Sequence, residues 1–512
     1  MKKRVLSAIS GLLILLMLAG CVSCKNLFWG NEREESDVID SESESIRIEE
    51  SDTQSDIEDE SDEELETDEK GFIKDQIGED IKYNGKEVKI IGWSGGGEID
   101  FDVQSGSTIS NAVYKRNVKV ESRLGVRLRF NTSLNGGNSN RYEYISSVEN
   151  MLMGTDNYDL IATYSMNASN FAMDGYLLNL ADREQIQLED YPWWSQDIVE
   201  NTVINGRTYF VSGPISPKLL YETMAIFVNL DLCDEYMLED PRYLVEDYEW
   251  TMEKMFEMAK GVGEDIEGDG KDNSDMYGIV LTRVALDGFI ASNDMRYLDR
   301  GIDASTGKEI IQIGTDFNNG IKIIDLAQTL KEKTNTVDVL LTATDSTAFI
   351  NGNSLFTTTQ FDIARIYREK MDFNYGYLPY PMADKLQQRY YSTAGFPYSM
   401  WCIPNSTTDA DCAAYVLECL ASESYREIQP AVFEDIKFKY SNDIISSEMF
   451  ELIIGNMTYD FGRLFHNNFD YAYSPIWTFR SAVAENKDFS TKFAESKTHI
   501  ETTLIGINGL YK

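Results

Sequence analysis

Short apolar runs alternate with amphipathic stretches along most of the chain after residue 84. The runs have the length and composition of buried strands, and they lie at 87–92, 126–130, 158–162 and 225–229. The stretch 110–124 has the period of a helix and ends at Gly125, a residue type that often terminates helices. Because strands and helices alternate, the pattern predicts the α/β class, with a parallel sheet covered on both faces.

Weaker patterns predict the secondary structure of the rest of the chain. Ile145, Val148 and Leu152 fall on one helical face that Gly154 ends, and an Asn-Gly turn is predicted at 205–206. A second set of extended segments is predicted at 349–356, 377–381 and 395–404. Thr408 is the predicted cap of a helix with an apolar face that runs through Cys412 and Cys419.

Ligands of parallel α/β sheets bind beyond the carboxyl ends of the strands. The residues that follow or end the predicted strands there are Trp93, Thr163, Tyr164 and Asn167. The pattern therefore predicts a ligand cleft at these residues. Trp193 and Trp194 are interpreted differently: two adjacent rings cannot easily face one cleft, so we expect them in the core.

The N-terminus differs in composition from the rest. Residues 1–20 have a basic start and a short apolar core, which is typical of an export signal rather than a spanning helix. The signal ends Leu-Ala-Gly before Cys21, which resembles the box of bacterial lipoproteins and implies a diacylated Cys21. Residues 21–83, rich in Asp, Glu and Ser, are predicted to form a disordered tether.

Composition narrows the function. The chain of 512 residues is long enough for two cores, and its formal net charge of −40 makes nucleic acid an improbable partner. Aromatic residues make up 12% of the chain, and flat rings stack well on the C–H faces of sugars. The six cysteines do not form a disulfide framework, although a Cys402–Cys412 bond remains open.

An acidic loop carries a possible metal site. Asp265, Glu267, Asp269 and Asp275 are spaced like the ligands of a calcium loop, with Gly270 in the sixth position. The twelfth position, where a bidentate Glu belongs, is Met276. A structural calcium and a solvated turn both remain open, and no other cofactor is expected.

Most catalytic arrangements find no support. The chain has only two histidines, His466 and His499, so a zinc site or a Ser-His-Asp triad is improbable. The glycines at 95–97 lack the Lys-Ser/Thr of a phosphate loop. A paired-carboxylate glycoside hydrolase is harder to dismiss, because 86 acidic residues guarantee close pairs by chance.

The order of segments from Tyr158 to Asn229 resembles the first-lobe core of extracellular solute-binding proteins, family 1, the sugar-binding group that serves ABC importers and includes maltose-binding proteins. The resemblance extends from about residue 85 to the end. It implies a two-lobed periplasmic-binding-protein-like fold of type II, each lobe a sheet flanked by helices, with the ligand cleft at the hinge. The implied lobes are 84–222 plus 395–440 and 223–394 plus 441–512.

The same resemblance implies a function and a set of contacts. The protein would be a monomeric lipoprotein on the extracellular face of the cell membrane that captures an oligosaccharide by hinge closure, delivers it to an ABC permease and catalyses no reaction. A peptide ligand, a glycan-binding surface protein and a glycoside hydrolase are the alternatives. The residues that match ligand-contacting positions are Asn167, Glu222, Gln360, Phe361, Asp362 and Trp477. For Trp93 and Trp477, an ordinary buried ring is an equally good interpretation.

Overall fold

The computed structural model describes residues 65–94, 107–155, 157–440 and 444–512. The predicted export signal, the lipidated Cys21 and most of the predicted tether lie outside the described residues. The chain divides into two compact units, Met1–Lys74 and Asp75–Lys512. In the described part of the first unit, Thr67 pairs with Ile73 across a turn at Gly71.

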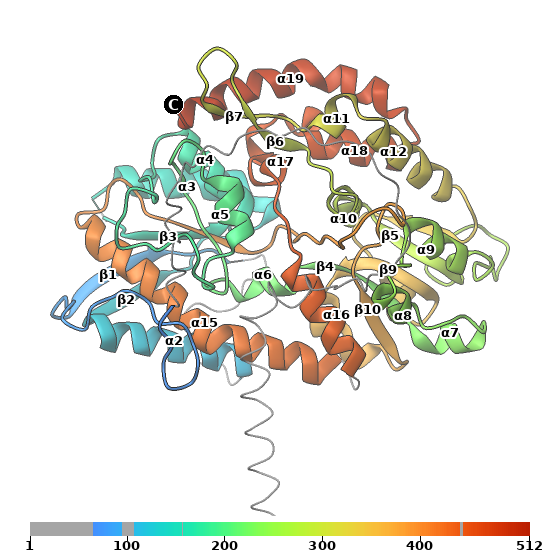
Figure 1. The fold of residues 1–512 in the computed structure, drawn as a ribbon, viewed down its shortest axis with the longest axis horizontal. Helices are drawn as coiled ribbons and strands as arrows, with labels where there is room; N and C mark the ends of the chain where they lie inside the picture. The colour runs from blue at the N-terminus through green and yellow to red at the C-terminus, as the bar shows by residue number, and fades with distance from the viewer. Residues whose placement is uncertain (1–64, 95–106, 156, 441–443) are drawn as a thin grey trace, which may run out of the picture. The chain divides into compact units, whose positions relative to one another are not determined.

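A four-stranded sheet with the order β11-β3-β1-β2 forms one half of the second unit (Figure 1). Its strands are β1 (Lys86–Ile91), β2 (Val126–Asn131), β3 (Leu160–Tyr164) and β11 (Ser399–Cys402). β1 pairs in parallel with both β2 and β3, which confirms the predicted parallel core, whereas β11 joins β3 antiparallel. The helices α2 (Thr108–Leu124) and α15 (Ala410–Tyr440) lie on one side of this sheet, and α3 (Arg141–Met153) lies on the other.

Local chemistry fixes the ends of these helices. The Ser107 side chain accepts a hydrogen bond from the Ser110 N–H at the start of α2, and Gly125 ends α2 with φ 63°, a conformation that glycine adopts without strain. The predicted cap of α15 at Thr408 is wrong by one residue. Asp409 accepts the Cys412 N–H instead, because its carboxylate is in reach of that donor.

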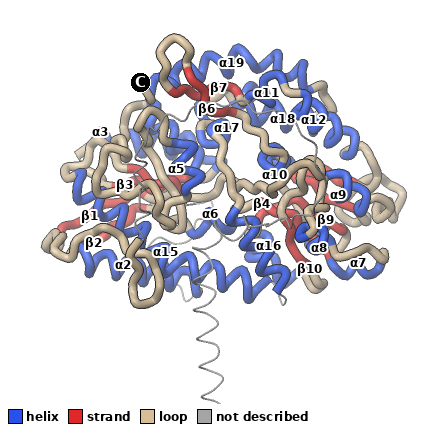
Figure 2. The backbone as a smooth tube through the Cα atoms, in the orientation of Figure 1, coloured by secondary structure: helices blue, strands red, loops and turns tan. Residues whose placement is uncertain are grey.

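A five-stranded sheet with the order β10-β4-β9-β5-β8 forms the other half (Figure 2). Its strands are β4 (Met224–Asn229), β5 (Tyr277–Thr282), β8 (Val339–Thr342), β9 (Ser354–Gln360) and β10 (Tyr375–Leu378). β5 runs parallel to β8 and β9, while β4 runs antiparallel to β9 and β10. α9 (Met252–Ala259) packs on β5, and α8 (Pro241–Glu246) and α16 (Ile444–Gly455) pack on β10.

The remaining elements cover the edges of the sheets and the C-terminal region. A hairpin of β6 (Leu298–Ile302) and β7 (Glu309–Ile313) packs against the last helix. The other helices are α4 (Ala168–Met173), α5 (Gln196–Thr202), α6 (Pro217–Tyr221), α7 (Leu230–Glu235), α10 (Asp287–Ser292), α11 (Thr315–Asn319), α12 (Ile321–Lys333), α13 (Thr347–Ile350), α14 (Asp362–Tyr367), α17 (Phe461–Leu464), α18 (Pro475–Ala484) and α19 (Phe489–Leu510). The 3-10 turns are η1 (Asn138–Asn140), η2 (Ser165–Asn167), η3 (Arg283–Ala285), η4 (Arg368–Lys370), η5 (His466–Asn468) and η6 (Tyr471–Tyr473).

Two connections between the sheets run side by side. Thr223 and Ala394 form an antiparallel bridge, and the Gly395 N–H donates to the Glu222 carbonyl at 2.6 Å. A Cβ atom at position 395 would lie 2.5 Å from Oε2 of Glu222, so glycine is needed there for this close approach. The sheets are thus joined by paired extended segments. The implied division into two lobes that close on each other stays a prediction.

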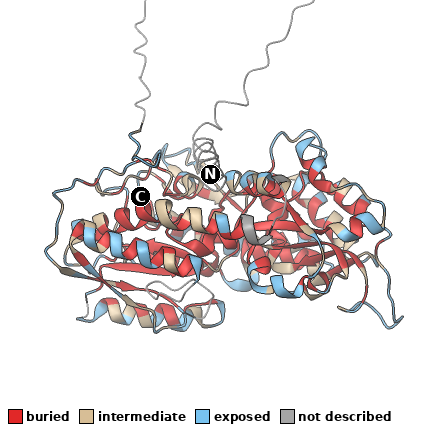
Figure 3. Ribbon diagram, turned by 90° about the horizontal axis from the view of Figure 1, so that it is seen from below, coloured by how far each residue is buried: buried red, intermediate tan, exposed pale blue. Residues whose placement is uncertain are grey.

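The core contains the residues that the sequence assigned to it. The central strands β3, β4 and β5 and the inner faces of the helices are buried, with exposed residues on the outer faces (Figure 3). Trp193 and Trp194 are both buried, as predicted. Cys233, Cys402, Cys412 and Cys419 are buried free thiols, so Cys402 and Cys412 are not bonded. Within the described residues, no helix has both the length and the apolar character needed to cross a membrane.

The second unit begins earlier than the predicted boundary at residue 84. The carboxylate of Asp75 is fully buried and lies within 3.3 Å of the Arg426 guanidinium. It also accepts hydrogen bonds from Arg123 at 2.7 Å and from Ser422 at 2.7 Å. The composition of 75–83 resembles that of the preceding acidic segment, which explains why the sequence pattern missed this anchor.

We therefore expect a truncation that removes residues 1–83 to be less stable than one that removes residues 1–74. The difference should be about 2 to 3 kcal/mol, because Arg123 and Arg426 lose a buried carboxylate partner. Denaturant unfolding of the two truncated proteins measures it. Equal stability would contradict the anchoring role of Asp75, and Asp75→Ala in the longer protein should reproduce most of the loss.

Candidate functional site

The carboxyl ends of both sheets lead to the same C-terminal segment. η2 follows β3 of the four-stranded sheet, and η3 follows β5 of the five-stranded sheet. α17 packs against η2, α18 packs against η3, and η5 contacts η2. The loops at which ligands bind in α/β sheets are thus brought together around residues 461–484.

Four rings form a row along this segment, which we call the aromatic strip: Phe396, His466, Tyr471 and Trp477. The centroids of Phe396 and His466 lie 5.9 Å apart with nearly parallel rings, and His466 lies 5.9 Å from Tyr471. Tyr471 lies 4.8 Å from Trp477. His466 is buried, Phe396 and Trp477 are half-buried, and Tyr471 is 49% exposed, so the strip presents ring surface to solvent.

Guanidinium groups lie at both ends of the aromatic strip. That of Arg463 lies 4.3 Å from the centroid of the Phe396 ring, and that of Arg283 lies 5.5 Å from the centroid of the Trp477 ring. Stacking of this kind holds the planar group against an aromatic face and leaves its edge free to donate hydrogen bonds.

A buried carboxylate positions two of the arginines. Asp287, at the start of α10, accepts hydrogen bonds from Arg480 at 2.7 and 2.9 Å, from the Tyr297 hydroxyl at 3.0 Å and from Arg463. Arg463 also donates to the Ala394 carbonyl at 2.5 Å, beside the paired connections between the sheets. One carboxylate therefore serves two guanidinium groups, and the cluster keeps an excess of positive charge.

The surrounding charge keeps His466 neutral. Burial, together with the positive charges of Arg480, Arg141 and Arg463, lowers the pKa of His466 to about 3. Its Nδ1 atom and the Oδ1 atom of the neighbouring Asn467 are buried without a hydrogen-bond partner among the described residues. Buried polar atoms without a partner are rare in folded proteins and are expected where a ligand supplies the missing bond.

Comparisons with known proteins concern the fold. No protein-family model matches the sequence, and no curated protein matches it. An ABC substrate-binding protein from Listeria monocytogenes, solved with cycloalternan, matches 82% of this chain and 99% of its own, with a TM-score of 0.52 and 12% identity. UgpB from Mycobacterium tuberculosis, solved with glycerophosphocholine, matches 81% of this chain and 98% of its own, with a TM-score of 0.54 and 14% identity.

The GacH receptor of Streptomyces glaucescens, solved unliganded and with acarbose, matches 82% of this chain and 98% of its own, with a TM-score of 0.51 and 13% identity. The chain has the fold of ABC substrate-binding proteins. The fold class predicted from the alternation of strands and helices is thereby confirmed.

Three of the predicted cleft residues are buried in this substrate-binding fold, and Asn167 contacts the segment that carries the strip. The Trp93 indole N–H donates to the Ser399 hydroxyl at 2.9 Å, and its ring packs edge-on against Tyr164 at 5.2 Å. Asn167 donates to the Gly136 carbonyl at 3.1 Å and accepts from the Asn467 amide at 3.2 Å. The three side chains are 2%, 3% and 0% exposed. Their direct contact with a ligand stays a prediction.

The residues predicted at the connections between the sheets form a separate charged cluster. Lys218 pairs with Glu222 at 3.1 Å and with Asp362, which also pairs with Arg365. Burial, with the nearby Asp362 carboxylate, raises the pKa of Glu222 to about 7, although Lys218 opposes this shift. Gln360 is half-buried beside Gly395. This cluster braces the connections, and its role in ligand binding also stays a prediction.

Two further predicted residues differ in their surroundings. Phe361 is fully buried and packs against Phe227, Tyr377 and Phe450, so neither of its faces is available to a ligand in this structure. Trp477 is half-buried at the end of the strip, where its position at the start of α18 follows from the Ser474 cap, whose hydroxyl accepts the Trp477 N–H at 3.1 Å.

Two carboxylates of the acidic loop accept hydrogen bonds from its own backbone, and the calcium site stays a prediction. Asp265 accepts the N–H groups of Gly268 and Gly270, and Asp275 accepts those of Ile266 and Asp272. Glu267 and Asp269 are exposed. No three acidic, His or Cys side chains converge on one point within the described ranges. The two carboxylates therefore stabilise the turn by accepting backbone hydrogen bonds.

Sequence reasoning missed most of the strip. Phe396, His466 and Tyr471 come from separate loops, and Arg283 follows a different strand, so no periodic pattern connects them. A weak signal existed in the aromatic-rich run from Tyr471 to Trp477, which contains the Ser-Pro helix start at 474–475.

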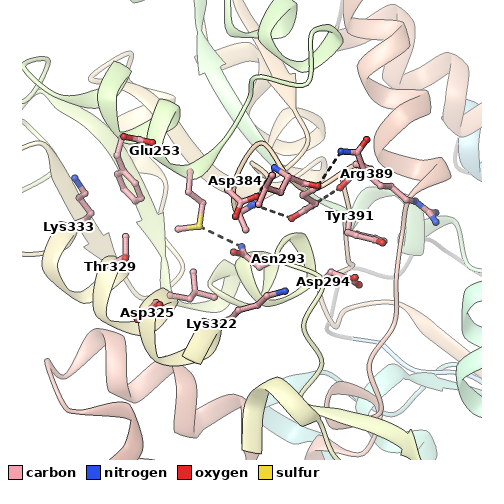
Figure 4. A pocket seen from close by; sticks show the side chains of 17 residues that line it. Glu253, Asn293, Asp294, Lys322, Asp325, Thr329, Lys333, Asp384, Arg389 and Tyr391 are labelled. Carbon is pink, nitrogen blue, oxygen red and sulfur yellow. Dashed lines mark hydrogen bonds between the residues drawn. The ribbon is translucent and has the colours of Figure 1, made fainter. Parts of the chain in front are cut away.

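A large pocket is lined by none of the residues of the strip. It has a volume of about 810 Å³, and its lining side chains come from α9, α12, the end of α10 and the loop 383–391 (Figure 4). Lys322, Asp325 and Glu253 give it charges of both signs. It contains none of the predicted ligand-binding residues, and its mixed charge indicates no particular ligand.

Proposed function

We propose that the protein is an extracellular substrate-binding lipoprotein that captures an oligosaccharide and delivers it to the permease of an ABC importer. The observation that carries the proposal is the aromatic strip, which lies where the carboxyl ends of both sheets meet in a substrate-binding fold. The ring surface that stays uncovered on Tyr471 and Trp477 suits a pyranose, because a sugar offers an apolar C–H face to an aromatic ring.

The polar atoms around the strip suit the same ligand. A sugar ring carries hydroxyl groups that both donate and accept hydrogen bonds, so it can satisfy Nδ1 of His466 and Oδ1 of Asn467. The neighbouring structures with cycloalternan and acarbose are complexes with sugars or sugar-like ligands, although they share only the fold with this chain. A peptide lacks the repeated C–H faces that the strip suits.

Hinge closure would couple capture to delivery. The paired connections at Thr223 and Ala394 are short and extended, as expected for segments that absorb a domain rotation. A ligand that contacts both sides stabilises the closed state by its extra contacts there, and the closed form would dock on the permease. Cys21, as the lipidated residue, would tether the protein to the outer face of the membrane.

The test is a thermal-shift screen of the purified full-length protein against neutral and acidic oligosaccharides, peptides and calcium. A ligand that binds only the native state raises the unfolding midpoint. We expect one oligosaccharide class to raise it and Trp477→Ala to abolish most of the shift, since loss of a stacked ring costs about 1 to 3 kcal/mol of binding.

Two results would contradict the proposal. A shift with peptides alone would leave the fold and replace the ligand class. Hydrolysis of the added glycan, followed by chromatography of the products, would make the protein an enzyme. Tyr243→Ala serves as the control. It removes an exposed ring that does not belong to the strip, so it should leave the thermal shift unchanged.

A further inference from the structure

We propose that the oligosaccharide bound at the aromatic strip is acidic, so that an anionic group of the ligand pairs with Arg283 at the exposed end of the strip. This inference rests on the proposed function and names the ligand class of the same site. The aromatic rings favour a sugar but do not distinguish a neutral sugar from an acidic one. The charges around the strip make that distinction.

Three guanidinium groups gather at the site around one shared carboxylate. The guanidinium groups of Arg283, Arg463 and Arg480 belong to it, and Asp287 is the carboxylate that pairs with two of them. Other carboxylates nearby keep their own charge. Glu485 pairs with Lys487 at 2.7 Å, and the charge of Arg283 also acts on it. Asp460 accepts the N–H groups of Tyr297, Leu298 and Gly462, and Asp470 accepts that of Ala472.

Arg283 is the guanidinium best placed to meet a ligand. It is half-buried over the exposed end of the strip, stacked on Trp477, and no ion pair or hydrogen bond of its side chain occurs with the described part of the chain. A sugar stacked on Trp477 would therefore place a ring substituent beside a guanidinium edge. That edge offers the paired N–H donors that match a carboxylate or a sulfate.

The guanidinium group of Arg141 adds positive charge near the strip. Arg141, at the start of α3, donates to Asn138 at 2.7 and 2.8 Å, but its Nε atom is buried without a hydrogen-bond partner among the described residues. Its charge reaches the strip, because it contributes to the lowered pKa of His466. An anion bound there would supply the countercharge that the described side chains do not.

The gathering of guanidinium groups at the strip contrasts with the acidic composition of the whole protein. With 86 acidic and 46 basic residues, the chain as a whole repels anions. A random surface site would be surrounded mostly by carboxylates. A concentration of guanidinium groups around the aromatic strip is thus unlike the rest of the molecule, and a neutral sugar would gain nothing from unpaired charge.

The experiment is calorimetric titration of the full-length protein with matched pairs of ligands. One pair is a uronic acid oligomer and its methyl ester, and the other is a sulfated oligosaccharide and its desulfated form. We expect one acidic member to bind about tenfold or more tightly than its neutral counterpart, with affinity that falls as salt rises. The two pairs distinguish carboxylate from sulfate as the recognised group.

Variants then assign the effect to the strip. Arg283→Gln should weaken binding of the acidic ligand about tenfold or more and leave binding of the neutral one within about twofold. Arg283→Lys should recover part of the affinity, because it restores the charge without the planar fork. Arg207→Gln removes the same charge from an exposed turn and should leave the affinity unchanged.

The outcomes separate this inference from the proposed function. If neutral oligosaccharides bind as tightly as acidic ones or more tightly, the charge inference is overturned and the oligosaccharide function stands. If an acidic sugar binds but Arg283→Gln and Arg141→Gln leave its affinity unchanged, the assignment to these arginines is overturned. If no saccharide binds and peptides do, the proposed function itself falls.

Discussion

Asp287→Ala is expected to lower the free energy of unfolding by about 3 to 5 kcal/mol, because it leaves two buried arginines without their shared carboxylate. Arg463 and Arg480 are each less than a tenth exposed, so water cannot replace the lost partner. The Tyr297 hydroxyl also loses its acceptor. Denaturant unfolding at neutral pH measures the loss.

An asymmetry within the cluster makes this prediction specific. Because there are two guanidinium groups for one carboxylate, Arg480→Met leaves a balanced Arg463–Asp287 pair and should cost clearly less than Asp287→Ala. Asp182→Ala, at an exposed position, controls for the substitution itself and should change stability by less than about 0.5 kcal/mol. A larger loss for Arg480→Met than for Asp287→Ala would show that Asp287 is not the residue that holds the cluster.

The same cluster connects stability with the site. Arg463 links Asp287 to the Ala394 carbonyl and to the ring of Phe396, so it fixes one end of the aromatic strip against the connections between the sheets. Asp287 therefore stabilises the fold and also positions one end of the aromatic strip.

The fold could be predicted because its strands carry clear apolar patterns. The runs that form β3 and β4 are buried throughout, β2 alternates buried and exposed residues, and β1 is buried mainly in its second half. A glycine also follows the first helix where a left-handed residue is needed. The apolar pattern did not predict the direction of the antiparallel strands. β11 is only four residues long, and its direction depends on where the chain returns, which local pattern does not specify.

The sequence predicted which edge of the sheet carries the site, but not which side chains face a ligand there. The rule about strand ends led to Trp93, Tyr164 and Asn167, but it does not say which way a side chain points. The Trp93 ring turns inward because its N–H finds the Ser399 hydroxyl, on a strand more than 300 residues away. Trp477 was identified through a resemblance, whereas its neighbours on the strip required the tertiary structure.

The aromatic cluster at 191–194 illustrates what local reasoning omits. Its burial was predicted, but not the group that makes burial tolerable. Both indole N–H groups donate to one buried carboxylate, that of Glu418 on α15, Trp193 at 2.8 Å and Trp194 at 3.1 Å. The Gln187 N–H is a third donor at 3.2 Å. Without an acceptor, each of these buried donors would carry a desolvation cost.

Glu418→Ala is therefore expected to lower the free energy of unfolding by about 3 to 5 kcal/mol, since it orphans three donors and leaves a cavity. Denaturant unfolding measures the loss. Glu189→Ala, at an exposed position on the neighbouring loop, serves as the control. A loss below about 1 kcal/mol would mean that water or rearranged side chains satisfy the two indoles.

The pH dependence of Glu418 gives an independent measurement. Burial raises the pKa of Glu418 to about 8 from an ordinary value of 4.5, although its three N–H donors oppose the shift. Between these values the folded state binds the proton more tightly than the unfolded state does, so this group's contribution to stability falls as pH rises from 4.5 towards 8. Glu418→Gln cannot titrate, and its stability should vary less steeply across that window. An identical slope for both proteins would mean that the three donors outweigh burial and keep the carboxylate ionised throughout.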